Sequence, residues 1–252
     1  FKQFAEGLGF TMQAMLVSIF GNILNITLGI IFVKGMFGIT PMGVKGVGLG
    51  TLIDRSLMAL VMAYYVLNSK NFKIYLQKFK ILAIDKIRSF QIIKIGAPVA
   101  MRYIFEISAF SGAAIIIGTI GTEEQAAHQI AITLAALTYM VASGVASSAT
   151  IKTGNYLGEK SFNDLRSSAI ASYHIIIAFM CLTALVFMFA SSMLPYIYTT
   201  DLKVIGIAAQ LLIIAGFFQL FDGTQVVGLG VLRGIGDVNV PTIITFLSYW
   251  VI

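Results

Sequence analysis

Long runs of apolar side chains alternate along the chain with short segments that hold almost all of the charged residues. The apolar runs cover residues 10–33, 46–67, 95–120, 126–151, 168–192 and 204–232, and a seventh begins near Val238. Each of the first six is long enough for the roughly 20 residues with which an α-helix crosses a bilayer core. The pattern therefore predicts an all-α polytopic membrane protein with about seven transmembrane helices.

Composition supports this interpretation, because hydrophobic residues make up 58% of the chain and charged residues only 11%. Ordinary soluble domains carry roughly 25% charged residues. The first apolar run is too long for a signal peptide, and several runs follow it, so it is expected to stay in the membrane. The seventh run is cut by the end of the chain, and the first residue is Phe1 rather than a methionine. We therefore expect the sequence to be a piece of a longer protein.

The basic residues gather on one side of the predicted membrane. If the runs alternate in direction, twelve of the seventeen Lys and Arg residues share a side, and seven of these lie within residues 68–94. Cytoplasmic loops of membrane proteins carry such an excess, so this side is predicted to be cytoplasmic. The net charge of +6 is thereby explained by topology, and no nucleic-acid partner is expected.

A short repeat predicts how the helices are grouped. GLGFTMQAM at residues 7–15 resembles GIGDVNVPT at residues 234–242, and six runs separate the two copies. An even number of spans makes the repeat parallel, as in transporters built from two similar bundles. Six helices per half predict twelve in the parent protein. Residues 1–67 would end the first bundle, 68–94 would form a basic cytoplasmic linker, and 95–252 would form most of the second bundle.

Two acidic residues, Glu106 and Asp222, lie inside apolar runs. Glu106 follows Lys94 by twelve residues and Asp222 precedes Arg233 by eleven, which places both roughly 16 to 18 Å from the basic side of the membrane. A charged group at such a depth costs at least ~2.5 to 3.5 kcal/mol and usually marks a pathway or a coupling site. Because a carboxyl group can exchange a proton or bind a hard cation such as Na⁺, we expect a coupling-ion site at these two acids. The alternative is that helix–helix hydrogen bonds satisfy them without any transport role.

Aromatic and amide side chains flank both acids. Phe218, Gln219 and Gln225 lie on or beside the face of Asp222, and Tyr103 and Phe110 flank Glu106. Aromatic rings around a buried carboxylate suit organic cations through cation–π attraction, whereas plain helix packing explains the same residues without a ligand. Arg102 precedes Glu106 by one helical turn, and a fixed ion pair between them is a second alternative.

Four segments resemble one family. IIKIGAPVAMRYIFEISAF (92–110), GTEEQAAHQIA (121–131), GNYLGE (154–159) and FDGTQVVGLGVLRGIGDVNVP (221–241) resemble multidrug and toxic compound extrusion (MATE) transporters of the NorM-like branch. The resemblance implies two six-helix bundles, of which this chain would hold helices five to ten and the start of eleven.

The resemblance also implies export of cationic or aromatic compounds in exchange for Na⁺ or H⁺. Glu106 and Asp222 match the family's acids in the seventh and tenth helices, which are tied to cation coupling. Phe218 stands where relatives often carry tyrosine, and Arg102 stands where they are usually neutral. A monomer in a bacterial inner membrane, with no enzymatic activity and no cofactor, is expected.

Two other functions are compatible with parts of the sequence. An intramembrane aspartyl protease would need paired aspartates such as Asp222 and Asp237, but Asp237 follows Arg233 at the membrane edge, too far for a shared proton. A lipid-linked oligosaccharide flippase of the same superfamily would need several basic residues in its cavity, and the apolar runs contain only Arg55 and Arg102. No cluster of His, Cys, Asp or Glu has the spacing of a zinc site, so no metal is expected beyond Na⁺ at Asp222 and Glu106.

Overall fold

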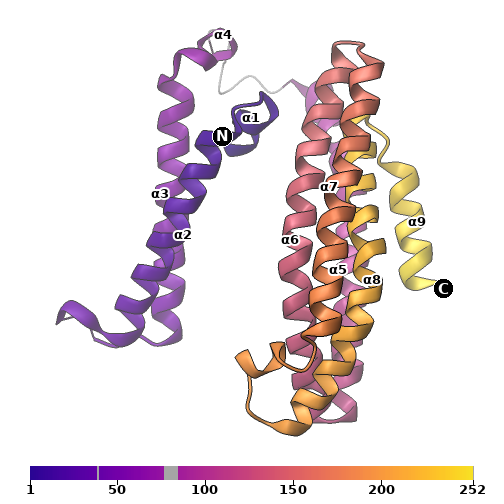
Figure 1. Cartoon of the computed structure of the whole chain (residues 1–252). Coiled ribbons are helices and arrows are strands. Elements are labelled where there is room, and N and C mark those ends of the chain that lie inside the picture. The colour runs from indigo at the N-terminus through magenta and orange to yellow at the C-terminus, as the bar shows by residue number, and fades with distance from the viewer. Residues whose placement is uncertain (39, 77–84, 252) are drawn as a thin grey trace. The chain divides into compact units, whose positions relative to one another are not determined.

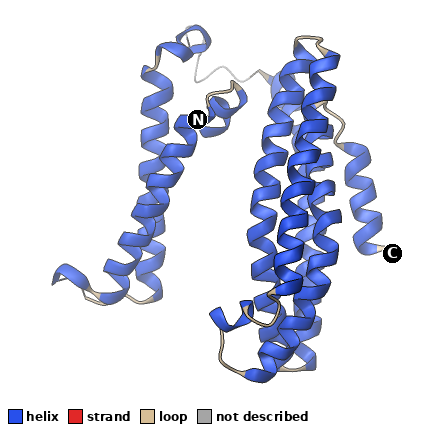
Figure 2. Ribbon diagram, in the orientation of Figure 1, coloured by secondary structure: helices blue, strands red, loops and turns tan. Residues whose placement is uncertain are grey.

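Helices joined by short turns form the part of the chain that the computed structural model describes, which is residues 1–38, 40–76 and 85–251. No strand occurs among these residues (Figure 2). The chain divides into two compact units, residues 1–84 and 85–252. Figure 1 shows both units with their helix labels.

The first unit is a pair of long helices with short helices at both ends. Helix α2 (Thr11–Lys34) packs along α3 (Val44–Asn68). Gly46 and Gly50 allow this, because a Cβ at Gly46 would lie 2.8 Å from the Cβ of Phe32. The short elements are α1 (Lys2–Gly7), η1 (Met36–Gly38), η2 (Lys70–Phe72) and α4 (Lys73–Leu76).

Asp54 is buried between α2 and α3, with 1% of its surface exposed. Its Oδ1 atom has no hydrogen-bond partner among the described residues. One helical turn away, the amide of Asn25 donates a hydrogen bond of 3.2 Å to the hydroxyl of Thr51. The interior of this helix pair is therefore polar at mid-length.

The second unit contains four long helices that run side by side (Figure 1). They are α5 (Lys86–Ile120), α6 (Thr122–Gly158), α7 (Phe162–Phe189) and α8 (Leu202–Gly234), followed by α9 (Asn239–Trp250), with the short η3 (Leu194–Ile197) between α7 and α8. Asp85 and Asp201 begin α5 and α8, because their carboxylates accept hydrogen bonds from first-turn N–H groups.

Small residues let α6 and α8 approach closely. A Cβ on Gly230 of α8 would lie 2.5 Å from the carbonyl oxygen of Ala146 on α6. Thr150 of α6 also donates a hydrogen bond of 2.7 Å to the carbonyl oxygen of Gly230. Contacts of this kind are typical of helix packing in membranes, where apolar burial supplies little attraction between helices. Helices α6 and α8 therefore form a tight seam through the unit.

Helix α9 packs against α5 and is hydrogen-bonded to it. The hydroxyl of Thr242 donates a hydrogen bond of 2.9 Å to the carbonyl oxygen of Pro98. The indole N–H of Trp250 donates one of 3.2 Å to the carbonyl oxygen of Phe105. The rings of Phe105 and Phe246 lie 4.9 Å apart. The second unit thus consists of the α6–α7–α8 group and the α5–α9 pair, which meet where α5 contacts α6.

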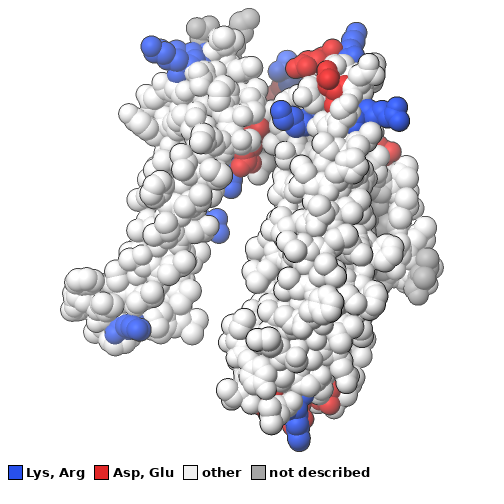
Figure 3. Space-filling model, in the orientation of Figure 1, with Lys and Arg blue, Asp and Glu red and all other residues white. Residues whose placement is uncertain are grey.

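The predicted spans are confirmed, because six helices are long and apolar enough to cross a membrane. The chain is an all-α polytopic membrane protein. On the face of the second unit that Figure 3 shows, charged side chains gather at the two ends of the helices, and the surface between them is uncharged. The seventh predicted helix is present as α9, which has 12 residues.

The predicted linker, residues 68–94, differs in part from the structure. Helix α5 begins at Lys86 rather than Ile95, so Lys86, Arg88 and Lys94 are helical. An α-helix extends past the apolar core when its polar end lies in the interface, and hydrophobicity alone does not mark that end. The boundary between the units falls within the predicted linker. Residues 77–84, which include Lys78 and Lys80, lie outside the described residues.

Candidate functional site

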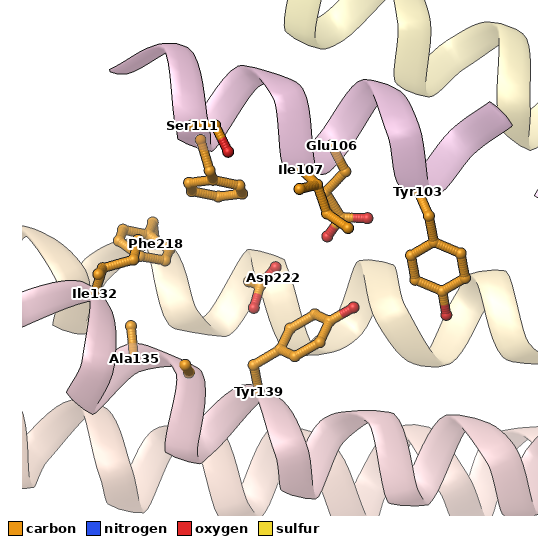
Figure 4. A pocket seen from close by; sticks show the side chains of 11 residues that line it. Tyr103, Glu106, Ile107, Ser111, Ile132, Ala135, Tyr139, Phe218 and Asp222 are labelled. Carbon is orange, nitrogen blue, oxygen red and sulfur yellow. The ribbon is translucent and has the colours of Figure 1, made fainter. Parts of the chain in front are cut away.

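A cavity of about 360 Å³ lies inside the second unit, between α5, α6 and α8. Its wall combines two acids with aromatic and small apolar side chains: Tyr103, Glu106, Ile107, Phe110, Ser111, Ile132, Ala135, Ala136, Tyr139, Phe218 and Asp222. Figure 4 shows the carboxyl groups of Glu106 and Asp222 pointing into the same opening from α5 and α8. The phenol of Tyr139 enters that opening from α6 (Figure 4).

Helical spacing explains how α5 supplies one side of the wall. Tyr103, Glu106 and Phe110 follow one another at intervals of three and four residues, so they share a face. Phe218 and Asp222 are four residues apart on α8 and share a face in the same way. The cavity therefore places an acid and an aromatic ring from each of two helices around one space.

Glu106 has a cationic partner that is not part of the cavity wall. Nη1 of Arg102 lies 3.1 Å from Oε2 of Glu106, and the two side chains are only 6% and 11% exposed. The guanidinium also lies over the ring of Tyr103, 4.2 Å from its centroid. The ion pair weighed from the sequence is therefore present, and Glu106 both faces the cavity and holds Arg102.

Five of the seven predicted site residues come together at this cavity: Asp222, Glu106, Tyr103, Phe110 and Phe218. The other two, Gln219 and Gln225, do not line it, and their role in substrate binding stays a prediction. Each lies three residues from Asp222, about 60° around the helix to either side. That offset turns Gln219 toward α6 and α7 and leaves Gln225 exposed.

The side chain of Gln219 forms hydrogen bonds with two neighbouring helices. Its amide Nε2 donates to the hydroxyl of Thr138 on α6 at 3.1 Å, and its Oε1 accepts from the hydroxyl of Thr183 on α7 at 2.9 Å. The residue is 1% exposed. Gln219 thus joins three helices behind the cavity.

Tyr139 and Ser111 are polar wall residues that the sequence did not indicate. Tyr139 lies near the middle of the apolar run 126–151, and a hydroxyl at that depth was an available signal. It was missed because tyrosine is uncharged and the chain has 10 of them. Only the packing of α6 against α5 identifies which tyrosine faces the acids.

The wall chemistry suits a positively charged ligand with apolar surface. It contains two carboxyl groups and no Lys or Arg, and most of the remaining lining is aromatic or aliphatic. Ligand pockets typically combine such an apolar lining with a few well-placed polar groups. Asp237, the second aspartate of the protease alternative, lies beyond the end of α8 and does not line this cavity. Among the described residues, no three His, Cys, Asp or Glu side chains are grouped to hold a metal ion.

Comparisons with known proteins agree with one another. Residues 98–252 match the MatE family model. The chain is 35% identical over 252 residues to a probable multidrug resistance protein NorM of Xylella fastidiosa strain 9a5c, covering 99% of this chain and 53% of that protein. It is 34% identical over 247 residues to the multidrug resistance protein MdtK of Photorhabdus laumondii subsp. laumondii, covering 98% of this chain and 54% of that protein.

Solved structures share the fold at lower identity. A crystal structure of MATE in the straight conformation gives a TM-score of 0.88 at 20% identity and covers 99% of this chain and 55% of its own. The eukaryotic MATE transporter AtDTX14 also gives 0.88, at 14% identity, with 98% and 55% covered. The chain spans about half the length of the curated relatives that it matches.

Proposed function

Since this chain belongs to the MatE family, we propose that the full-length protein containing it is a secondary transporter that exports organic cations from the cytoplasm in exchange for Na⁺ or H⁺. The chain would supply the last two helices of one bundle and most of the other. Relatives named as multidrug resistance proteins support export of drug-like compounds.

The observation that carries the proposal is the cavity with two acids within membrane-spanning helices. Glu106 and Asp222 provide negative charge for a cation, and Tyr103, Phe110 and Phe218 provide rings for its apolar surface. Cation–π attraction reaches ~2 kcal/mol or more when the site is desolvated. A single space would thus accept either an organic cation or a small coupling cation.

Exchange follows if both cations need the same carboxylate. An organic cation from the cytoplasm occupies the cavity at Asp222, and a Na⁺ or H⁺ from outside then takes that carboxylate and displaces it. Release of the coupling ion inside restores the site. A ligand shifts such a transporter between states only through different affinities for them, so the ion gradient drives the cycle through competition of the two cations for Asp222.

The protein is proposed to act as a monomer in the inner membrane of a bacterium, in contact with the bilayer alone. The bacterial origin of the relatives supports this location. An oligosaccharide flippase is less well supported, because the cavity wall contains two acids and no base.

Ethidium efflux from cells that express the full-length protein tests the proposal. Wild type is compared with Asp222→Asn under imposed Na⁺ and H⁺ gradients, and Glu159→Gln serves as the control because Glu159 is exposed outside the cavity. We expect gradient-driven efflux to be lost only in Asp222→Asn at normal protein levels, and the gradient that drives wild type identifies the ion. Undiminished efflux in Asp222→Asn would refute the role of this acid.

A further inference from the structure

One wall acid already holds a cation. Nη1 of Arg102 is 3.1 Å from Oε2 of Glu106 within a buried pair, four residues apart on α5. A buried ion pair is commonly structural. This pair differs from a purely structural ion pair, because Glu106 also lines the cavity.

Arg102 reaches Glu106 from behind the wall. It does not line the cavity with the two acids, but it lines two smaller cavities beside it. Tyr103 lines both the main cavity and one of the smaller ones, and its ring centroid lies 4.2 Å from the central carbon of the Arg102 guanidinium. The guanidinium is thus held by the carboxylate of Glu106 and by the ring of Tyr103, outside the lining of the main cavity.

In the part of the chain that the structure describes, the charged groups at the cavity are two acids and one base. Its wall has two carboxyl groups, and Arg102 is the one basic side chain of the described residues within ion-pair distance of either. The guanidinium of Arg233 lies farther away, 6.0 Å from the centroid of the Tyr103 ring, and Arg233 lines both smaller cavities. The acids and their paired guanidinium therefore sum to a single negative charge.

We propose that Arg102 is a built-in cation that occupies the place of an exchangeable cation at Glu106, so that the cavity binds a single positive charge, at Asp222. Arg102 thereby determines which ligands are accepted: singly charged organic cations are preferred over doubly charged ones. Glu106 shapes the wall and holds Arg102, and Asp222 is the acid that releases and rebinds cations. The inference rests on the proposed function, in which organic cations occupy this cavity.

Ethidium and propidium provide a matched pair of probes, because they share one ring system and carry one and two positive charges. Their affinities for the purified full-length protein are measured by fluorescence, and the ratio of propidium to ethidium affinity is compared among variants. By Coulomb's law, one added negative charge several ångströms from the second positive charge raises this ratio by about tenfold or more. The ratio cancels changes that affect both probes equally.

Four variants, compared with wild type, then form a charge series. Arg102→Gln leaves a net charge of two negatives and should raise the ratio about tenfold or more. Glu106→Gln leaves Asp222 and Arg102 with a net charge of zero and should lower the ratio by a similar factor. The double variant Arg102→Gln with Glu106→Gln restores one negative charge and should return to the wild-type ratio. Arg102→Lys keeps the charge and should also match wild type. If any single variant fails to fold, the remaining ones still test whether the affinity ratio follows the net charge.

A ratio that stays constant across the folded variants would overturn the inference and leave Arg102 with a structural role only. Transport distinguishes this failure from failure of the proposed function. If export remains coupled to an ion gradient while the ratio is constant, the charge-holding role alone is wrong. If the ratio follows the charge series while no ion gradient drives export, the proposed antiport alone is wrong.

Discussion

Replacement of Gln219 by leucine separates a role in helix packing from a role in ligand binding. The Gln219 side chain is buried at the junction of α6, α7 and α8, where it donates to Thr138 and accepts from Thr183. Leucine has a similar size and no polar atoms. The substitution therefore removes two hydrogen bonds between helices without changing the wall of the cavity.

The expected loss of stability is small and can be worked from these contacts. Hydrogen bonds between membrane helices contribute about 0.6 kcal/mol each on average, so two amount to ~1.2 kcal/mol. Neither threonine is left without a partner, since Thr138 also donates to the carbonyl oxygen of Ala135 and Thr183 to that of Met180. We therefore expect a decrease of about 1–2 kcal/mol in the free energy of unfolding, rather than the larger penalty of an unsatisfied buried group.

Thermal unfolding of the purified full-length protein measures this change, and ethidium binding is measured in parallel. Gln219→Leu should lower the melting temperature by a few degrees, at roughly 2–4 °C per kcal/mol, with ethidium affinity unchanged. Phe218→Leu is the matched control on the neighbouring position. It should weaken ethidium binding several-fold through the loss of a ring from the wall, with little change in melting temperature.

The reverse pattern would refute this reasoning. If Gln219→Leu lost ethidium affinity at an unchanged melting temperature, its amide would contact the ligand, as the sequence pattern first indicated. The assigned packing of α8 against α6 and α7 would then be incorrect at this level of the membrane.

Two further substitutions test the packing of each unit. Gly230→Ala should lower the free energy of unfolding by about 1–3 kcal/mol, because the new Cβ would overlap the backbone of α6. Gly206→Ala is the control on the same helix, because a Cβ there meets nothing within 4 Å. In the same melting experiment this control should be neutral or slightly stabilising. Asp54→Leu should raise the melting temperature, because it removes a buried oxygen that has no hydrogen-bond partner among the described residues. A lower melting temperature would mean that the carboxyl group of Asp54 has a hydrogen-bond partner in the full-length protein.

The helices were predictable from sequence because the membrane imposes a strong constraint. An apolar solvent permits only segments that satisfy their own backbone hydrogen bonds, so long apolar runs predict helices directly. Boundaries were less predictable. Asp85 caps a helix that continues through Lys86 and Arg88, and hydrophobicity carries no information about such a cap.

The two charged residues of the candidate site were predictable from the sequence. Glu106 and Asp222 stand out because charged residues within apolar runs are rare, and their distance from the basic side gave a common depth. The helical rotation of uncharged neighbours was not accessible in the same way. Gln219 lies about 60° from Asp222, which is compatible with either the cavity or the α6–α7 interface, and only the positions of Thr138 and Thr183 decide between them.

The division of the second unit into an α6–α7–α8 group and an α5–α9 pair has a thermodynamic consequence. Glu106 belongs to α5 and Asp222 belongs to α8, so a displacement of α5 relative to α8 changes the separation of the two carboxyl groups. A cation that binds more tightly at one separation stabilises the corresponding helix arrangement. By linkage, any condition that favours that arrangement raises the affinity for the cation by the same factor. Ligand charge and helix position in this unit are therefore two variables of one equilibrium.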